Sequence, residues 1–484
     1  MKPKFLNFFG LVILGLIMSD IHAQPPIHEE IGKLVQEAPF KMGAPELPEI
    51  GANADTITKF GAIGDGTFLN TISIQNAIDS SAAKGGGKVV IPPGIWLTGP
   101  VALKSNINLH LMEGAILLFT KDHTQYPLIG KDGKYTVMSP IYANNLHDIA
   151  ITGKGIINGN GASWRPVKKV KLTEGQWKAL TKSGGVVTSD GGMWWPSEEA
   201  KEAETYLKNL KNKKKSALAE DFVPARDFLR PYMVLINHCK RVLIDGPTLM
   251  NSPKFGLVPK GCRDLIIRDV TINNEWYAQN GDGMDIGDSK NVIVYKCTVT
   301  AGDDGICMKS NYSAKDSNAA TLQNVIISDC KVYHGHGGFV IGSNEGGGME
   351  NIYVHNCSFI GTDAGIRVKS SRDRGGLVQH IFLDGIYMEN IQGPAIVFNS
   401  YYEQKDNART NVPVTRTTPR FQYFKLSNIY CSSASESISL TGLPEYPVNH
   451  IYFEHVRIQA DKDYHAVDAK DIYFKDVAVN GSKL

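Results

Sequence analysis

Two glycine-flanked acidic turns are the part of the sequence best suited to chemistry. Residues 280–283 read Asn-Gly-Asp-Gly and residues 302–305 read Gly-Asp-Asp-Gly, which supplies the carboxylates of Asp282, Asp303 and Asp304. Crowded carboxylates can act as acid and base together, because like charges raise the pKa of one group and leave its neighbours ionised. Cleavage of a glycosidic bond needs such a pair, a protonated acid at the leaving oxygen and a carboxylate that activates water or attacks carbon.

The imidazole of His336 is expected beside these carboxylates. Asp282 and Asp303 are separated by about the length of one coil of the repeat described below. Asp303 and His336 stand at the same offset from Val292 and Val325, which are the first apolar residues of two successive repeats. If the repeats stack in register, His336 lies on the rung next to the aspartate pair and on the same face.

Cations are expected one rung further along. Arg367 and Lys369 belong to the repeat that begins at Asn351, and Lys309 has the same phase in its own repeat as Lys369. Arg367 and Lys369 alternate along their strand and therefore project to one face. Two cations there would suit a sugar carboxylate. Each of these signals alone is typical of an ordinary turn or a solvated strand, so the hypothesis depends on their coincidence on consecutive rungs.

A short repeat predicts the elements that position these residues. Each copy begins with a polar residue, continues with alternating apolar positions, and is separated from the next by Gly, Asn and Asp turns, as expected for one short strand. The copies begin at Asn106, Asp148, Arg241, Asp264, Asn291, Asn324, Asn351, His380, Asn428, His450 and Asp471. From Arg241 to His380 the period is roughly 20 to 35 residues, too short for propeller blades, and no regular Leu/Asn consensus is present. We therefore predict an all-β fold, a parallel β-helix in which each unit is one coil.

The cysteines fit the same stack. Cys297, Cys330 and Cys357 each fall at the same offset from the first apolar residue of their unit, which predicts a column that faces the interior. We interpret the column as small buried thiols and not as disulfide or redox chemistry. The seven cysteines leave at least one thiol unpaired, and no CxxC or Cys/His cluster indicates a metal site.

The start of the β-helix and one internal segment depart from the repeat. Residues 74–83 have helical periodicity, and this helix is expected to cap the open end of the stack, an edge that would otherwise invite aggregation. Residues 89–92 are predicted as the first strand. Residues 162–229 are Lys- and Glu-rich and are predicted as a partly helical insertion on the solenoid, with a helical segment over 198–218.

Two features of this insertion, a possible helix cap and a pair of tryptophans, can be interpreted from the sequence. Thr173 and Gln176 have the spacing of a capping box at a helix start. Trp194 and Trp195 could stack on sugar rings or pack the insertion onto the β-helix, and the sequence does not favour either. Further insertions near Trp276 and between residues 311 and 320 could deepen the walls around the acidic turns.

The first residues are predicted to be an export signal. Lys2 and Lys4 precede an apolar run over residues 5–18 and a small-residue cleavage site ending at Ala23, and the run is shorter than the about 20 residues that span a bilayer. We expect a signal peptide at 1–23, a leader at 24–55, and one catalytic domain at 56–484 in a periplasmic or secreted protein. The net charge of +2 gives no argument for a nucleic acid or a membrane as partner.

Four short motifs in the chain resemble those of glycoside hydrolase family 28, the polygalacturonases and their relatives. The family carries Asn-Thr-Asp, Gly/Gln-Asp-Asp, Gly-His-Gly and Arg-Ile-Lys in this order. Residues 280–282, 302–304, 335–337 and 367–369 read Asn-Gly-Asp, Gly-Asp-Asp, Gly-His-Gly and Arg-Val-Lys. The two departures lie away from the charged groups, and the resemblance spans most of the chain.

The resemblance implies a right-handed parallel β-helix and an inverting hydrolase of pectic polysaccharide, with no cofactor and no metal. Matched by motif, Asp303 would be the general acid, Asp282 and Asp304 would activate water, and His336 would support the protonation state of the acid. Arg367 and Lys369 would bind the substrate carboxylate. The full set of expected substrate-binding residues is Arg367, Lys369, Lys309, Asn280 and either Tyr401 or Tyr402.

Several activities fit this resemblance. Residues 337–343 look more like exo-acting bacterial members, which together with the insertion favours attack at the chain end of polygalacturonate. Relatives that cut rhamnogalacturonan or xylogalacturonan are alternatives within the family. A Ca²⁺-dependent pectic lyase on the same fold and a non-catalytic β-helical adhesin or carbohydrate-binding module are alternatives outside it.

Overall fold

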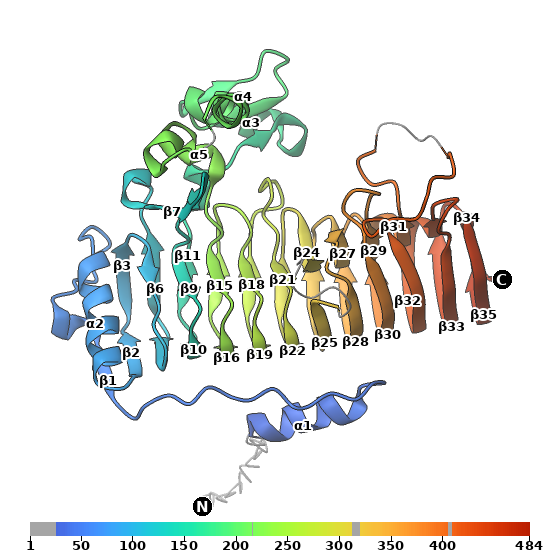
Figure 1. Ribbon diagram of the computed structural model, residues 1–484, viewed down its shortest axis with the longest axis horizontal. Coiled ribbons are helices and arrows are strands. Elements are labelled where there is room, and N and C mark those ends of the chain that lie inside the picture. The colour runs from blue at the N-terminus through green and yellow to red at the C-terminus, as the bar shows by residue number, and fades with distance from the viewer. Residues whose placement is uncertain (1–25, 215, 312–319, 405–408) are drawn as a thin grey trace, which may run out of the picture.

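The protein is a right-handed parallel β-helix, a stack of coils that runs the length of the molecule (Figure 1). A computed structural model describes residues 26–214, 216–311, 320–404 and 409–484. One sheet contains 31 strands, and almost all of its pairings are parallel, so the predicted fold class is confirmed. The predicted signal peptide at 1–23 and most of the predicted wall between 311 and 320 lie outside the described residues.

The strands form three parallel ladders along the stack. The first ladder is β1 (Ala54–Thr56), β2 (Gly87–Ile91), β5 (Ile107–Leu111), β10 (His147–Gly153), β16 (Lys240–Asp245), β19 (Arg263–Arg268), β22 (Lys290–Tyr295), β25 (Leu322–Ser328), β28 (Met349–Ile360), β30 (Leu377–Glu389), β32 (Arg420–Thr441), β33 (Val448–Ala460) and β35 (Ala469–Val479). The second is β3 (Gly94–Thr98), β6 (Ala115–Phe119), β11 (Ile156–Asn158), β17 (Thr248–Met250), β20 (Thr271–Asn273), β23 (Thr298–Thr300) and β26 (Lys331–Tyr333), and it continues into β28. The third is β4 (Val101–Ala102), β9 (Ile141–Asn144), β15 (Val234–Asn237), β18 (Leu257–Lys260), β21 (Met284–Gly287), β24 (Asp304–Ser310), β27 (Gly337–Glu345), β29 (Ile366–Lys369), β31 (Ile391–Asn399), the end of β32, and β34 (His465–Val467).

The polar residue that opens each repeat has a left-handed backbone. All eleven predicted starts have φ between 52° and 63°, a conformation that Asn and Asp tolerate better than most residues. Several of these side chains also bond along the stack, where Asn324 donates to Asn291 at 3.3 Å and Asn351 donates to Asn324 at 3.1 Å. The periodic polar residue is therefore both the turn residue and the link between coils.

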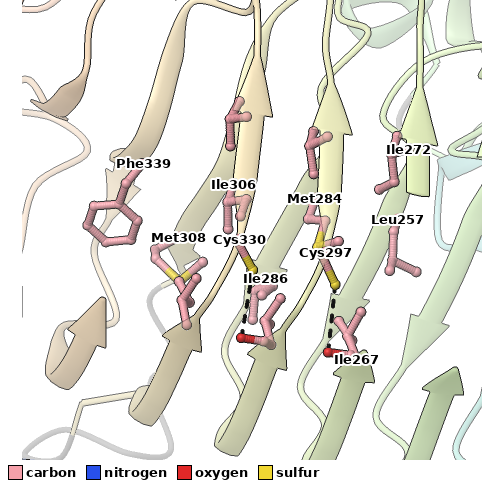
Figure 2. Packing of buried hydrophobic residues seen from close by; sticks show 14 of the residues in the cluster. Leu257, Ile267, Ile272, Met284, Ile286, Cys297, Ile306, Met308, Cys330 and Phe339 are labelled. Atoms are coloured by element: carbon pink, nitrogen blue, oxygen red, sulfur yellow. Dashed lines mark hydrogen bonds between the residues drawn. The ribbon is translucent and has the colours of Figure 1, made fainter. Parts of the chain in front are cut away.

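The interior is filled by several apolar side chains from each rung. Cys297 and Cys330 point inward among Met284, Ile286 and neighbouring apolar side chains in Figure 2. Both thiols are buried, as is Cys357 on the next rung. All seven cysteines are buried free thiols, which confirms that the column is part of the core.

The N-terminal end of the stack is closed by α2 (Thr71–Ala83), whose Ile74 and Ile78 are buried in the core. The predicted capping helix is confirmed, although it begins at Thr71, one turn earlier than expected. Residues 89–91 lie in a strand, β2, as predicted, but the prediction that this strand is the first one was wrong. The short β1 precedes β2 and pairs with it, and a strand of that length has no readable alternation.

A second helix, α1 (Ile27–Glu37), lies outside the first ladder, below the strands in Figure 1. Ile31 and Leu34 are buried against outward-facing apolar residues of the coils, including Ile293. Glu30 pairs with Arg268 of β19 at 3.0 Å and with Lys296, directly after β22, at 2.5 Å. The leader segment is thus attached along the β-helix by both apolar and ionic contacts.

The insertion leaves the stack after β11 and returns at β15, and it rises above the coils in Figure 1. Its elements, in chain order, are β12 (Val167–Lys168), α3 (Glu174–Lys182), β13 (Val186–Val187), β14 (Met193–Trp195), α4 (Glu198–Lys213) and α5 (Arg226–Leu229). The capping box of Thr173 and Gln176 is confirmed. The helix predicted to reach residue 218 ends at Lys213. The Leu218 amide bonds to the Asp221 carboxylate at 2.7 Å and opens a separate 3₁₀ segment.

The tryptophans of the insertion have packing contacts. Trp194 is buried, and its indole N–H donates to the Gly184 carbonyl at 2.8 Å. Trp195 stacks on Phe228 with ring centroids 6.0 Å apart. Both partners lie within the insertion, so these contacts hold the insertion together and do not show that it packs onto the β-helix through its tryptophans. In the part of the chain that the structure describes, no helix is both long and apolar enough to cross a membrane.

Candidate active site

The three predicted aspartates meet on the third ladder. Met284 of β21 pairs in register with Ile306 of β24, so Asp282 and Asp304, each two residues earlier, occupy adjacent rungs. One oxygen from each of Asp282, Asp303 and Asp304 lies within 4.8 Å of the others. The flanking glycines allow the turns to approach closely, since a Cβ on Gly305 would lie 2.5 Å from a Val332 methyl group. The structure therefore brings together the cluster that the repeat spacing predicts.

Asp304 is neutralised by the two predicted cations. Lys369 Nζ donates to both carboxylate oxygens of Asp304, at 3.1 and 2.8 Å. Arg367 Nη1 lies 3.6 Å from Asp304 Oδ1. Burial alone would lower the pKa of Lys369, but the charge of Asp304 raises it above its usual value.

Asp303 is paired with His336. His336 Nδ1 lies 2.9 Å from Asp303 Oδ1, and the His336 amide donates to the Asp303 carbonyl at 2.7 Å. Burial pushes the pKa of Asp303 upward, but the hydrogen bond and charge of His336 and the charges of Lys369 and Lys171 outweigh it and lower the pKa to about 2. In the substrate-free protein Asp303 is therefore ionised at neutral pH.

Asp282 has the opposite electrostatic environment. It is 2% exposed, and its Oδ1 has no hydrogen-bond partner among the described residues. Burial, followed by the charges of Asp285 and Asp303, raises its pKa well above the usual value. Two neighbouring carboxyl groups with opposite pKa shifts are the arrangement that acid–base catalysis requires.

Lys309 lies on β24, the strand that begins at Asp304. Its Nζ is 2.9 Å from Asp285 Oδ1 and 5.3 Å from the centre of the Phe255 ring. It occupies the same register column as Lys369. Met308 pairs with Ile341, which places Lys309 opposite Gly342, and Gly342 pairs with Lys369. Its predicted phase is therefore correct, but its charge is balanced by a protein carboxylate.

Of the two candidate tyrosines, Tyr402 lies at the site. Its ring centre is 5.6 Å from Arg367 Cζ and 5.0 Å from Lys369 Nζ. Tyr401 is buried and faces Arg372 instead, at 5.2 Å. A pocket of about 390 Å³ adjoins the cations, and its polar lining is His336, Asp363, Arg367, Lys369, Asn399 and Tyr402.

The insertion reaches this site, which the sequence did not predict. Lys171 Nζ donates to the Gly302 carbonyl at 3.0 Å and lies 3.4 Å from His336 Nε2. Arg165 is buried and pairs with Glu275, at 2.6 Å, in the loop before Asp282. These residues belong to no repeat, so neither phase nor motif could have identified them.

Arg230, at the return of the insertion, holds the other end of the same loop. It donates to the Gln279 carbonyl at 2.9 Å and to Asn280 Oδ1 at 2.8 Å. Asn280, predicted as a substrate-binding residue, therefore already accepts a hydrogen bond from the protein. The two ends of the insertion position the turn that carries Asp282.

The aspartate cluster also offers oxygen ligands of the kind that Ca²⁺ prefers. Lys369 Nζ, however, occupies both oxygens of Asp304, and His336 occupies one oxygen of Asp303. A divalent cation at the cluster would lie close to an ammonium group that already neutralises the carboxylate. The donor set therefore fits acid–base chemistry better than metal binding.

Glu345, at the end of β27, is a fully buried carboxyl group near this site, and no described residue hydrogen-bonds to either of its oxygens. Burial raises its pKa from 4.5 to about 8, against the weaker opposing effects of Ser370, Lys309 and Lys369. The folded protein therefore holds a proton that the unfolded chain releases above pH 4.5, so the contribution of Glu345 to the free energy of unfolding falls as the pH rises through this range.

Replacing Glu345 by Gln should remove this dependence. The variant should gain stability relative to the unmodified protein as the pH rises from 4.5 towards 8, with a slope of up to about 1.4 kcal/mol per pH unit, and should show no gain at pH 4. Urea unfolding of both proteins across this range measures the difference. Parallel stability profiles would show that Glu345 is not protonated in the folded state.

A parallel β-helix with acid and base carboxyl groups beside a pocket belongs to the class of carbohydrate-cleaving solenoids. Residues 169–478 match the sequence profile of glycosyl hydrolases family 28, and the chain belongs to this family. The protein is therefore a glycoside hydrolase, and the resemblance carried by the four motifs is confirmed.

Individual relatives agree with the family. The chain is 25% identical over 423 residues to a probable polygalacturonase of Vitis vinifera, covering 84% of this chain and 74% of the relative. It is 28% identical over 414 residues to an exo-poly-α-D-galacturonosidase of Dickeya chrysanthemi, covering 82% of this chain and 65% of the relative. The crystal structure of an exopolygalacturonase from Thermotoga maritima superposes with a TM-score of 0.72 at 24% identity, over 94% of this chain and 97% of that one, which shows the shared fold.

Proposed function

We propose that this enzyme hydrolyses α-galacturonosyl linkages in a pectic polysaccharide and that it attacks the chain end. The observation that carries the proposal is the convergence of Asp282, Asp303 and Asp304 within 4.8 Å, with Arg367 and Lys369 lining the adjoining pocket. A polymer of uronic acids presents one carboxylate per sugar, and the two cations provide a charge-assisted site for it. The names of the curated relatives agree with this substrate.

In the proposed mechanism Asp303 is the general acid. Its pKa is low in the empty site partly because Lys369 and Lys171 are positively charged. A bound substrate carboxylate neutralises these cations and excludes water, which raises the pKa of Asp303 and allows it to carry a proton to the leaving oxygen. His336, hydrogen-bonded to Asp303, holds that carboxyl group in place and exchanges the proton with it.

Asp282 and Asp304 activate the water that attacks the anomeric carbon, which inverts its configuration. Asp304 is clamped by Lys369 on both oxygens, which disfavours a covalent bond from Asp304 to the sugar. A water shared by two carboxylates can be deprotonated by whichever is ionised. Asp282, which is protonated before the substrate binds, passes its proton to Asp303, whose pKa rises on binding and whose carboxylate lies within 4.8 Å. This transfer leaves Asp282 ionised as the base and Asp303 protonated as the acid.

The insertion supports attack at the chain end. Lys171, Arg165 and Arg230 attach it to the loop 275–280 that precedes Asp282. The insertion stands above the coils on the N-terminal side of the aspartates (Figure 1). A wall at that position would stop a polysaccharide from extending past the catalytic residues in this direction.

The N-terminal segments have proposed roles that follow from the sequence. Residues 1–23 are proposed to direct export to the periplasm or the outside of the cell, where the substrate is found. Residues 24–55 form a leader, and residues 56–484 act as one catalytic domain with the insertion at 162–229. The catalytic residues require neither a cofactor nor a metal.

Incubation of the purified protein with polygalacturonate in the presence of a chelator tests the reaction class. We expect new reducing ends at an undiminished rate and no ultraviolet absorption from an unsaturated sugar, because hydrolysis adds water across the bond. Loss of activity in the chelator together with an absorbing product would instead identify a Ca²⁺-dependent lyase. Binding without release of reducing sugar would identify a carbohydrate-binding protein.

A further inference from the structure

A serine, a histidine and an aspartate meet where the insertion joins the coils. Ser163 ends a 3₁₀ turn (Gly161–Ser163) at the start of the insertion, and Asp227 lies on α5 at its end. His123 opens another 3₁₀ turn (His123–Gln125), which follows β6. His123 Nε2 is 3.1 Å from Ser163 Oγ, and His123 Nδ1 is 2.8 Å from Asp227 Oδ1. The imidazole therefore joins the hydroxyl group to the carboxylate.

The imidazole of His123 is held in one orientation. Its ring stacks on the indole of Trp164, with ring centres 3.4 Å apart and planes 18° from parallel, and Trp164 is fully buried. The carboxylate of Asp227 fixes the tautomer, because it accepts a hydrogen bond from Nδ1. In the neutral ring Nδ1 then carries the hydrogen and Nε2 keeps a lone pair, so His123 can take a proton from the hydroxyl group of Ser163.

Ser163 is partly exposed, and its hydroxyl group has two acceptors within reach. Besides His123 Nε2, the Asn160 carbonyl lies 3.0 Å from Ser163 Oγ, so the hydroxyl hydrogen can rotate between them. The preceding residue, Ala162, is exposed, and its backbone amide has no acceptor among the described residues. That N–H is a donor available to a carbonyl oxygen that approaches Ser163 from solvent.

We propose that Ser163, His123 and Asp227 form a second catalytic site, which hydrolyses esters with a small acyl group, such as an acetylated hydroxyl group of a sugar. Ser163 Oγ attacks the carbonyl carbon while His123 takes the hydroxyl proton, and the ester C–O bond then breaks as the alcohol leaves with that proton. Water next attacks the acyl-serine carbon, gives a proton to His123, and releases the carboxylic acid as the serine is regenerated. None of the three residues belongs to the aspartate cluster or lines the pocket beside it, so this activity is separate from glycoside hydrolysis.

A fluorophosphonate probe tests the nucleophile, because it reacts with serine hydroxyl groups that a base activates. We expect the label at Ser163, located by mass spectrometry, and no label there in Ser163→Ala. Asp227→Asn removes the group that fixes the tautomer of His123, so it should slow labelling by at least about 100-fold. Ser183→Ala is the matched control and should label at the unmodified rate, since Ser183 is an exposed serine of the insertion that donates to the Leu180 carbonyl at 2.7 Å.

Hydrolysis of 4-nitrophenyl acetate tests turnover. We expect kcat/KM to fall at least about 100-fold in Ser163→Ala and to stay unchanged in Ser183→Ala, with thermal unfolding midpoints measured to show that both variants are folded. Undiminished ester hydrolysis in Ser163→Ala, or an equal labelling rate in Asp227→Asn, would overturn the second site. Absence of label at Ser163 in the unmodified protein would also overturn it, and that result needs no variant to fold. Neither readout counts reducing ends, so the outcome is independent of the proposed function.

Discussion

Replacement of Asp303 by asparagine is expected to lower kcat on oligogalacturonate by about 10³-fold while substrate affinity is retained. Asparagine keeps the shape of the side chain and can still bond to His336, which lies 2.9 Å away, but it cannot carry a proton to the leaving oxygen. The measurement is kcat by release of reducing ends, together with calorimetric binding of the same oligomer.

An activated substrate distinguishes the role of the general acid, Asp303, from the role of the base, Asp282. The leaving group of an aryl galacturonide needs little protonation, so Asp303→Asn should lose far less activity on it than on oligogalacturonate. Asp282→Asn should lose activity on both, because it removes a group that activates water. If Asp282→Asn were rescued by the aryl substrate and Asp303→Asn were not, the two roles would have to be exchanged, as their pKa shifts in the empty site would also allow.

Lys369→Met is expected to damage both stability and activity. Lys369 is 5% exposed and neutralises Asp304, which is 3% exposed, so its loss leaves a buried carboxylate with only Arg367 nearby. Breaking a buried pair from one side costs about 3 kcal/mol in the free energy of unfolding. Activity should fall at least 100-fold, because the same ammonium group is proposed to bind the substrate carboxylate.

Two further variants test the charge balance at Asp304. Lys475→Met breaks an exposed Lys–Glu pair with a contact of 2.6 Å and should cost less than about 1 kcal/mol. The double variant Lys369→Met/Asp304→Asn should regain much of the lost stability, since no unpaired charge remains, but should stay inactive. Urea unfolding and kcat/KM measure the two effects. Equal destabilisation by the buried and the exposed substitutions would contradict the proposed charge balance.

The periodic part of the molecule could be predicted from the sequence. Each repeat begins with a residue that accepts a left-handed backbone, and its apolar positions fall on one interior face. These local preferences repeat along the chain, so the stacking of Asp303 against His336 followed from counting residues. Register between coils is transmitted by hydrogen bonds such as Asn351 to Asn324, which fix the phase over several rungs.

The contacts that the sequence did not predict are made by residues outside the periodic repeat. Lys171 and Arg230 come from the insertion, and their approach to the aspartates depends on how that insertion folds back. The choice between Tyr401 and Tyr402 depends on the direction of two successive side chains in a loop, which alternation cannot decide. The helix at Ile27–Glu37 was missed because its apolar partners lie on the outer face of the coils, where a repeat pattern predicts solvent.

The charge balance of the site depends on ion pairs that no motif reveals. Lys309 has the predicted phase, but Asp285 balances its charge. Lys254 has no distinctive motif, yet its ammonium group lies over the rings of Tyr232 and Phe255 without a carboxylate partner among the described residues. How strongly a cation attracts the substrate depends on how much of its charge a carboxylate of the protein already neutralises. Which cations are left unpaired can be seen only in the three-dimensional structure.

The most direct test of the central claim is the size of the first products from polygalacturonate. We predict that galacturonic acid monomer appears from the earliest time point, while the average length of the remaining polymer falls slowly. An early ladder of oligomers would keep the hydrolase and contradict attack at the chain end. No product of any size would contradict the proposed substrate.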